Sequence, residues 1–197
     1  MPIPAFTIDG VLPPYVGPGG PGGAPQDMSP YAVTALEVVS TLGLIDTRKS
    51  ILRGWLRHRA ALRRIGFDRG FQWLDGSFVE SKEPRDLDIV TFLHRPPSAG
   101  DPDQIAALIR ANRHLFDRSR VKMNFSLDAF PVDLDGSPEA LVGSARYFLG
   151  LFSHRRGDDL WKGMLQVRIE DIADDEAALA ALGPDTATGV AMSEGNP

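Results

Sequence analysis

Residues 74–90 read LDGSFVESKEPRDLDIV, and this stretch sets our expectation of the fold. Phe71–Asp75, which leads into it, alternates apolar and polar side chains as a short strand does. Residues 88–93 are apolar and β-branched and predict a second strand, buried in the core. Gly76-Ser77 marks the end of the first strand, so two neighbouring strands joined by a turn are expected here.

Two aspartates stand at the start of the second strand. Asp86 and Asp88 are two positions apart, so in an extended chain both carboxylates project from the same face. Two like charges this close repel each other, and burial makes the repulsion worse. A divalent cation removes the conflict, and ligands that offer only oxygen suit Mg²⁺ or Mn²⁺. The pair is therefore a candidate metal site.

A third carboxylate is expected on another strand, to complete the metal site and to assist deprotonation of an attacking hydroxyl. Residues 124–134 alternate apolar and polar side chains and predict that strand. Asp128 lies in its middle, where an unpaired carboxylate would be costly, whereas Asp133 lies near its end and is expected in solvent. We therefore select Asp128; its structural alternative is an ion pair with a nearby arginine.

The turn between the first two strands suits an anion. Gly76 lets the backbone approach a phosphate closely, and the Ser77 hydroxyl and the exposed amides can donate to its oxygens. Lys82 is a candidate to assist, although Glu80 and Glu83 flank it and reduce the positive charge of the segment. The sequence thus predicts a phosphate cradle beside a cation site.

The order of these motifs resembles the nucleotidyltransferase superfamily typified by DNA polymerase β. In that superfamily a Gly-Ser turn precedes an acid-x-acid strand, and a third acid lies on a later strand. Gly76-Ser77, then Asp86 and Asp88, then Asp128 follow this order. The resemblance implies a nucleotidyltransferase fold, an α/β (α+β) arrangement in which helices flank a small mixed sheet.

The chain is still more similar to small bacterial nucleotidyltransferase-like proteins, over most of residues 8–169. Three segments carry this likeness: Leu12-Pro13-Pro14, Asp75 to Asp88, and Phe152, Arg156, Lys162 and Gly163. The likeness implies that Arg156 and Lys162 bind the triphosphate. An equally weighted alternative is a solvated loop in which Asp158 and Asp159 balance the basic residues.

The resemblance implies a Mg²⁺-dependent enzyme that moves a nucleoside monophosphate from an NTP to a hydroxyl on a protein side chain or a tRNA end. Related minimal nucleotidyltransferases act as toxins or antitoxins, which suggests a toxin–antitoxin or defence setting. The alternative class is a non-catalytic protein on the same fold, either an antitoxin that acts by contact or a nucleotide sensor.

The composition of the chain excludes or disfavours several other classes of protein. The chain has 197 residues and no cysteine, which excludes disulfides. Its net charge of −5 argues against a general nucleic-acid binder. We expect no signal peptide and no membrane span, hence a cytoplasmic protein. Seven basic residues and no acid occupy residues 48–64 of a predicted helix, which could bind tRNA phosphates, an acidic partner or this protein's own acidic surface.

The expected organisation has three parts: residues 1–28 as a flexible Gly/Pro-rich arm, 29–182 as the folded domain, and 183–197 as a disordered tail. Within the domain, periodicity predicts four helices and four strands. The helices are expected at 30–42, 47–65, 102–117 and 138–151, and the strands at 71–75, 88–93, 124–134 and 164–169.

Overall fold

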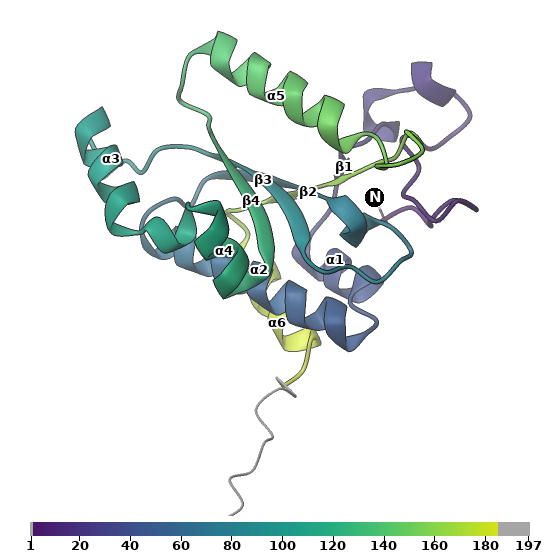
Figure 1. Cartoon of the computed structure of the whole chain (residues 1–197), viewed down its shortest axis with the longest axis horizontal. Helices are drawn as coiled ribbons and strands as arrows, with labels where there is room; N and C mark the ends of the chain where they lie inside the picture. Colours follow the sequence, from purple (N-terminus) through teal and green to yellow (C-terminus); the bar gives the residue numbers. More distant parts are fainter. Residues whose placement is uncertain (1, 185–197) are drawn as a thin grey trace, which may run out of the picture.

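The computed structural model of the chain describes residues 2–184 as six α-helices and one five-stranded mixed sheet (Figure 1). This confirms the predicted α/β class with helices flanking a small mixed sheet. The helices are α1 (Ala35–Leu42), α2 (Asp46–Arg64), α3 (Pro102–Ala111), α4 (Arg118–Phe125), α5 (Pro138–Phe152) and α6 (Ile172–Ala181). The strands are β1 (Tyr31–Ala32), β2 (Gly70–Asp75), β3 (Leu87–Leu93), β4 (Leu127–Asp133) and β5 (Leu165–Arg168).

The sheet has the order β1-β5-β2-β3-β4. β2 runs antiparallel to both of its neighbours, while β4 runs parallel to β3 because α3 and α4 carry the chain back between them. β4 forms one edge of the sheet, and Pro131 lies in its middle opposite Thr91 of β3. The other edge is β1, which is only two residues long.

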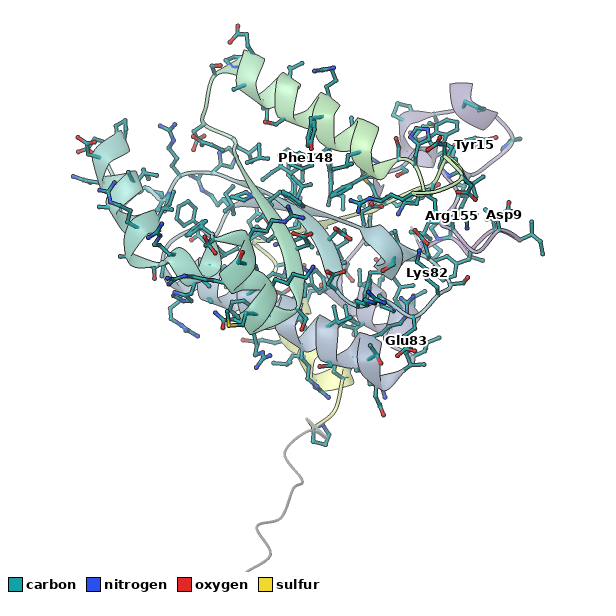
Figure 2. All side chains as sticks on the ribbon, in the orientation of Figure 1. Asp9, Tyr15, Lys82, Glu83, Phe148 and Arg155 are labelled. Atoms are coloured by element: carbon teal, nitrogen blue, oxygen red, sulfur yellow. The ribbon has the colours of Figure 1, made fainter. Side chains whose placement is uncertain are left out.

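The two faces of the sheet are covered unequally. Along β3, Leu87 and Ile89 join a large core with α1, α2, α4 and α6, and Val90 and Phe92 point the opposite way. Among the helices of residues 2–184, α5 alone covers that second face, through Phe148 and Phe152 (Figures 1 and 2). The charged residues described below lie on this second face, at one end of the strands.

Several expected boundaries are wrong. The first helix begins at Ala35 rather than at residue 30, because Thr34 caps it and exchanges side-chain hydrogen bonds with Glu37. The helix expected at 102–117 ends at Ala111, and a separate helix, α4, occupies the start of the strand expected at 124–134. β1 and α6 were not expected.

The N-terminal segment differs from the expected flexible arm. Val11 and Leu12 are buried, and the Leu12 N–H donates to the Val79 carbonyl while its carbonyl accepts from the Gly163 N–H. Farther out, the Arg155 guanidinium donates to the Asp9 carbonyl at 2.7 Å (Figure 2). The segment thus packs on the domain because apolar side chains interrupt its polar and glycine-rich stretches.

At the other end, the expected tail falls largely on residues 185–197, which lie outside the described part of the chain. Within residues 2–184 no helix combines the length and the apolar character needed to cross a bilayer.

Most of the basic side chains of α2 bind groups of this same chain. Arg59 is fully buried and pairs with Asp175 of α6 at 2.8 Å, and Arg63 contacts the same carboxylate at 2.6 Å. Arg53 donates to carbonyls near residue 182, and Arg48 is buried. Arg59 and Arg63 thus bind an acidic residue of this chain, as one alternative expected, whereas Arg48 and Arg53 bind backbone carbonyls, and the helix is chiefly a structural element.

Candidate active site

Three aspartates, one from each of β2, β3 and β4, lie side by side at one end of the sheet. Asp75 is the antiparallel partner of Asp88, and Asp88 is the parallel partner of Asp128. All three share the face of α5, because Leu74, Leu87 and Leu127 beside them point into the opposite core. The structure therefore brings together Asp88 and Asp128, which are 40 residues apart in the sequence.

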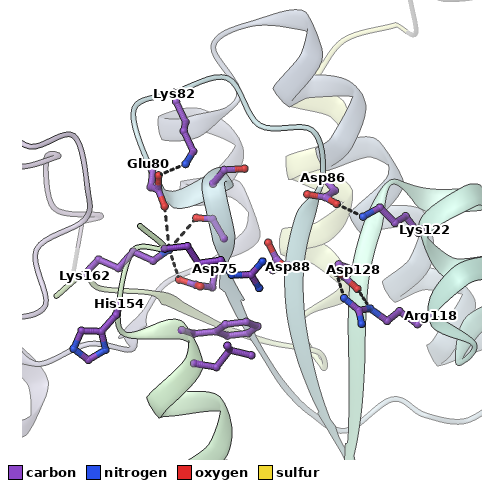
Figure 3. A pocket seen from close by; sticks show the side chains of 15 residues that line it. Asp75, Glu80, Lys82, Asp86, Asp88, Arg118, Lys122, Asp128, His154 and Lys162 are labelled. Carbon is purple, nitrogen blue, oxygen red and sulfur yellow. Dashed lines mark hydrogen bonds and ion pairs between the residues drawn. The ribbon is translucent and has the colours of Figure 1, made fainter. Parts of the chain in front are cut away.

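These carboxylates line a cavity of about 400 Å³ (Figure 3). Its lining contains five acidic and five basic side chains, so its formal charge is balanced. The acidic members are Asp75, Glu80, Asp86, Asp88 and Asp128, and the basic ones are Lys82, Arg118, Lys122, Arg156 and Lys162. Gly76 and Ser77 also line it, so every candidate site residue from the sequence faces one cavity.

Gly76 lies in direct contact with the Asp88 carboxylate. Its φ is +73°, and a Cβ placed on it would lie 1.8 Å from Oδ2 of Asp88. Only glycine fits there, on grounds of both backbone conformation and space. The turn continues as a short 3₁₀ helix, η3 (Gly76–Val79), so Ser77 stands beside the acids. The Gly-Ser turn and the acidic strand are thus parts of one site.

Lys162 has a different place from the one implied by the resemblance. Its side chain is 2% exposed, and Nζ lies 3.0 Å from Asp75 Oδ1 and donates to the Gly76 carbonyl at 3.0 Å (Figure 3). It also lies 3.4 Å from Glu80 Oε1, and Lys82 binds the same carboxylate at 2.7 Å. Lys162 therefore holds the turn in place, while Lys82 stands at the exposed rim.

Asp75 was not selected from the sequence, although it directly precedes Gly76. Burial raises its pKa to about 7, against the lowering effect of the neighbouring Lys162. Burial thus disfavours the charged form of this carboxyl group, and the ion pair with Lys162 opposes that effect. Asp75 forms the floor of the cavity and fixes Lys162.

The segment after the turn is supported from behind by α2. The buried Arg48 guanidinium donates to the carbonyls of Phe78, Glu80 and Lys82 at 2.7, 2.6 and 2.9 Å. It also lies over the Phe78 ring, 4.9 Å from the ring centroid. Three backbone carbonyls thus converge on one cation, which fixes the segment that carries the expected phosphate ligands.

Two of the three expected metal ligands form ion pairs with α4. Lys122 Nζ lies 2.6 Å from Asp86 Oδ2, and Arg118 binds both oxygens of Asp128, with Nη2 to Oδ2 at 2.6 Å (Figure 3). The Arg118 guanidinium also stacks over Phe130 at 4.8 Å. Hydrogen bonds from Arg118 hold the pKa of Asp128 below its usual range. The arginine-pair alternative for Asp128 is therefore present in the structure.

As the side chains stand, no three metal-binding side chains converge within residues 2–184. The donor chemistry nevertheless suits a hard divalent cation, since Asp86, Asp88 and Asp128 offer only carboxylate oxygens on adjacent backbone segments. Their basic partners are held on long, exposed side chains and can be replaced. The residues therefore fit Mg²⁺ or Mn²⁺ once those partners move.

Asp88 and Arg156 are the two charged members of the cavity for which no ion pair is found among the described residues. Burial, followed by the charges of Asp86 and Asp128, raises the pKa of Asp88. The charge of Arg156 acts in the opposite direction on Asp88 and also lowers the pKa of Asp128. Arg156 thus faces the acids with its guanidinium available to an anion.

The wall opposite the sheet is the C-terminal end of α5. Leu151, Phe152 and His154 line the cavity there, and a second hollow of about 430 Å³ continues past Leu151, His154 and Arg156. The sequence resemblance includes Phe152, whereas Leu151 was not selected and His154 was assigned no role. Leu151 and His154 could have been identified from their positions close to Arg156 in the sequence.

The chain was compared with known proteins. A family model described as a family of unknown function, DUF6932, matches residues 4–168. The chain belongs to that family. The matched span includes the cavity and all of its lining residues. No curated protein and no solved structure matches the chain.

Proposed function

We propose that this DUF6932 member is a metal-dependent nucleotidyltransferase with a nucleotidyltransferase fold. The observation that carries the proposal is the contact between Gly76 and the Asp88 carboxylate. It supports a site in which a phosphate held by the turn lies beside a cation held by the acids. Phosphoryl and nucleotidyl transfer need this arrangement, because the metal must neutralise the negative charge of the phosphate oxygens.

In this proposal Asp86, Asp88 and Asp128 hold Mg²⁺ or Mn²⁺, which would neutralise the charge that develops on the phosphate oxygens. The amides after Gly76 and the Ser77 hydroxyl bind the terminal phosphates of an NTP. Lys162 keeps that turn in place without touching the phosphates.

Arg156, and the exposed Lys82 once it leaves Glu80, supply positive charge to the triphosphate. The support for Arg156 is its lack of an ion pair among residues 2–184 and its electrostatic effect on Asp88 and Asp128. Arg156 is therefore the residue of the family-like C-terminal segment that we assign to the substrate, in preference to Lys162.

The transfer step joins the acceptor oxygen to the α-phosphorus. A hydroxyl of a protein side chain or a tRNA end attacks in line, the bond from the α-phosphorus to the bridging oxygen breaks, and pyrophosphate leaves. The proton of the hydroxyl passes to Asp128, the carboxylate on the open edge strand, when Arg118 no longer occupies it. A toxin–antitoxin or defence setting and a cytoplasmic location complete the proposal.

The test is transfer of label from each NTP, radioactive at the α-phosphate, in the presence of Mg²⁺ or Mn²⁺, total tRNA and cell extract. Asp88→Asn removes the unpaired carboxylate without changing its size. The matched control is Asp133→Asn, on the outer end of β4, where the carboxylate is exposed and pairs with Arg95. Label on a protein or RNA band with wild type and Asp133→Asn, and none with Asp88→Asn, is expected.

Absence of label with every nucleotide, in protein shown to be folded, would refute transfer and favour the binding protein or nucleotide sensor. Equal labelling by wild type and Asp88→Asn would also refute the assigned site.

A further inference from the structure

Two basic residues of α4 lie on the same side of that helix and reach the same end of the sheet. Arg118 and Lys122 are four positions apart, which is about one turn. Their side chains are 61% and 55% exposed, whereas the carboxylates that they bind, Asp128 and Asp86, are only 9% and 19% exposed. Asp128 is fixed within β4 and Asp86 directly precedes β3, so the exposed cations are the movable members.

The position of α4 does not depend on these ion pairs. Val121 of α4 is fully buried in the main core. At the end of the helix the Phe125 backbone crosses α2 so closely that a Cβ on Gly54 would lie 2.0 Å from the Phe125 carbonyl oxygen. Asp117 caps the start of the helix by accepting a hydrogen bond from the Arg120 N–H. Packing and capping therefore fix α4, and the two cations can leave the acids without moving the helix.

The oxygens that Arg118 and Lys122 bind are those that a divalent cation would need. A cation and an ammonium or guanidinium group cannot occupy the same carboxylate oxygens, so one must displace the other. The cationic ends of both pairs are exposed, so water and salt screen them and a divalent cation can compete for the carboxylates. Arg118 and Lys122 line the same cavity as Gly76, Ser77 and the unpaired Arg156, so displaced cations can reach phosphates bound in it.

We propose that Arg118 and Lys122 are a mobile pair of phosphate-binding residues. They neutralise Asp128 and Asp86 until a divalent cation takes these carboxylates, and they then bind the phosphates of the incoming nucleotide. This inference rests on the proposed function. It also gives an order of binding, in which the metal increases the affinity for the nucleotide by releasing two cations.

The alternative is that both ion pairs are purely structural. The two alternatives predict different directions of change in the metal affinity when the pairs are removed. If the pairs compete with the metal, their removal strengthens metal binding and weakens nucleotide binding. If they only orient the acids, their removal weakens or leaves unchanged both affinities. Measurements of binding, without turnover, therefore decide between them.

The variants are Arg118→Met, Lys122→Met and the double variant, in which methionine preserves part of the apolar side-chain stem. The control is Arg120→Met, a substitution of an exposed residue of α4 that does not line the cavity. Binding of Mn²⁺ alone is measured by electron paramagnetic resonance. Binding of a fluorescent, non-hydrolysable NTP analogue is then measured at saturating Mn²⁺.

We expect each single variant to bind Mn²⁺ up to about fivefold more tightly than wild type, the equivalent of removing one exposed ion pair. We expect the affinity for the nucleotide to fall at least about tenfold in the double variant, through loss of two charge-assisted contacts. Arg120→Met should match wild type in both measurements. A Mn²⁺ affinity that is unchanged or lower, no Mn²⁺ binding by any variant, or an unchanged nucleotide affinity would overturn the inference.

The outcome is separable from that of the transfer assay. Opposite shifts in the two affinities, with no label transferred, would support this inference in a nucleotide sensor and refute the enzyme. Label transfer by wild type, with no change of either affinity in the α4 variants, would support the enzyme and refute the mobile pair.

Discussion

Two buried groups, His58 and Asp75, should make contributions to the free energy of unfolding that largely cancel between about pH 4 and about pH 6.5, because they act in opposite directions there. His58 is 1% exposed and packs against the edge of Phe125. Its Nε2 lies 3.0 Å from the Leu115 carbonyl oxygen, and no partner for Nδ1 is found in the described part of the chain. Burial lowers the pKa of His58 from 6.5 to about 4.

The signs follow from which state binds the proton. Between about 4 and 6.5 the unfolded chain protonates His58 and the folded one does not, so stability rises with pH. Burial raises the pKa of Asp75 from 3.8 to about 7, so over that range the folded state holds the proton and stability falls with pH. At about 1.4 kcal/mol per pKa unit, the full effects are about 3 kcal/mol for His58 and about 4 kcal/mol for Asp75.

Substitution of either His58 or Asp75 should reveal the pH dependence of stability that the other contributes. In His58→Gln the stability should fall, relative to wild type, by up to about 1.4 kcal/mol for each pH unit as pH rises through the shared range, since the contribution of Asp75 is no longer cancelled by that of His58. In Asp75→Asn it should rise by a similar amount. The double variant should follow the pH dependence of wild type, which controls for any general loss of stability.

The measurement is urea unfolding at constant ionic strength, followed by the fluorescence of the buried Trp55 and Trp73, at half-unit steps of pH. Parallel profiles for wild type and both single variants would refute the reasoning, because they would mean that neither group changes its proton affinity on folding.

Three further outcomes are expected. Gly76→Ala should abolish label transfer and lower stability by about 2 kcal/mol in urea unfolding, because its Cβ would displace the Asp88 carboxylate and its φ is positive; activity within twofold of wild type would contradict this. Arg48→Met should lower stability by about 3 kcal/mol and weaken nucleotide binding at equilibrium, since three carbonyls lose their donor; unchanged affinity would separate this arginine from the site. Asp175→Ala should lower the free energy of unfolding by about 3–5 kcal/mol, because Arg59 would remain buried without its counter-ion; a loss below about 1 kcal/mol would contradict that account.

The strands that carry the acids could be predicted because their signals are local. Alternation along β2 and the β-branched run of β3 reflect which side chains face the core, and Asp128 was selected because a carboxylate in the middle of a strand needs a partner. The Gly-Ser turn could also be predicted from local signals, since the alternating pattern of β2 ends at Asp75, directly before Gly76. The close approach of Gly76 to Asp88 depends on strand pairing, which the sequence pattern alone does not give.

The features that were missed depend on contacts between distant segments. Arg48 and Arg59 look like surface residues of a basic helix until the carbonyls and the carboxylate that they bind are placed around them. α4 has only one buried residue, Val121, so its apolar pattern is too weak to mark a helix. Leu12 is buried only because the domain folds over it, and its glycine- and proline-rich surroundings suggested a flexible segment.

The edges of the sheet determine how the chain meets other copies of itself. An exposed strand edge is a template for intermolecular pairing and aggregation. Pro131 removes a backbone donor from the middle of β4, and β1 offers only two residues at the opposite edge. Neither edge therefore favours extension of the sheet by a second molecule. Strand pairing with a second copy is therefore disfavoured at the edge that carries Asp128, so self-association of this kind would not cover the site proposed here.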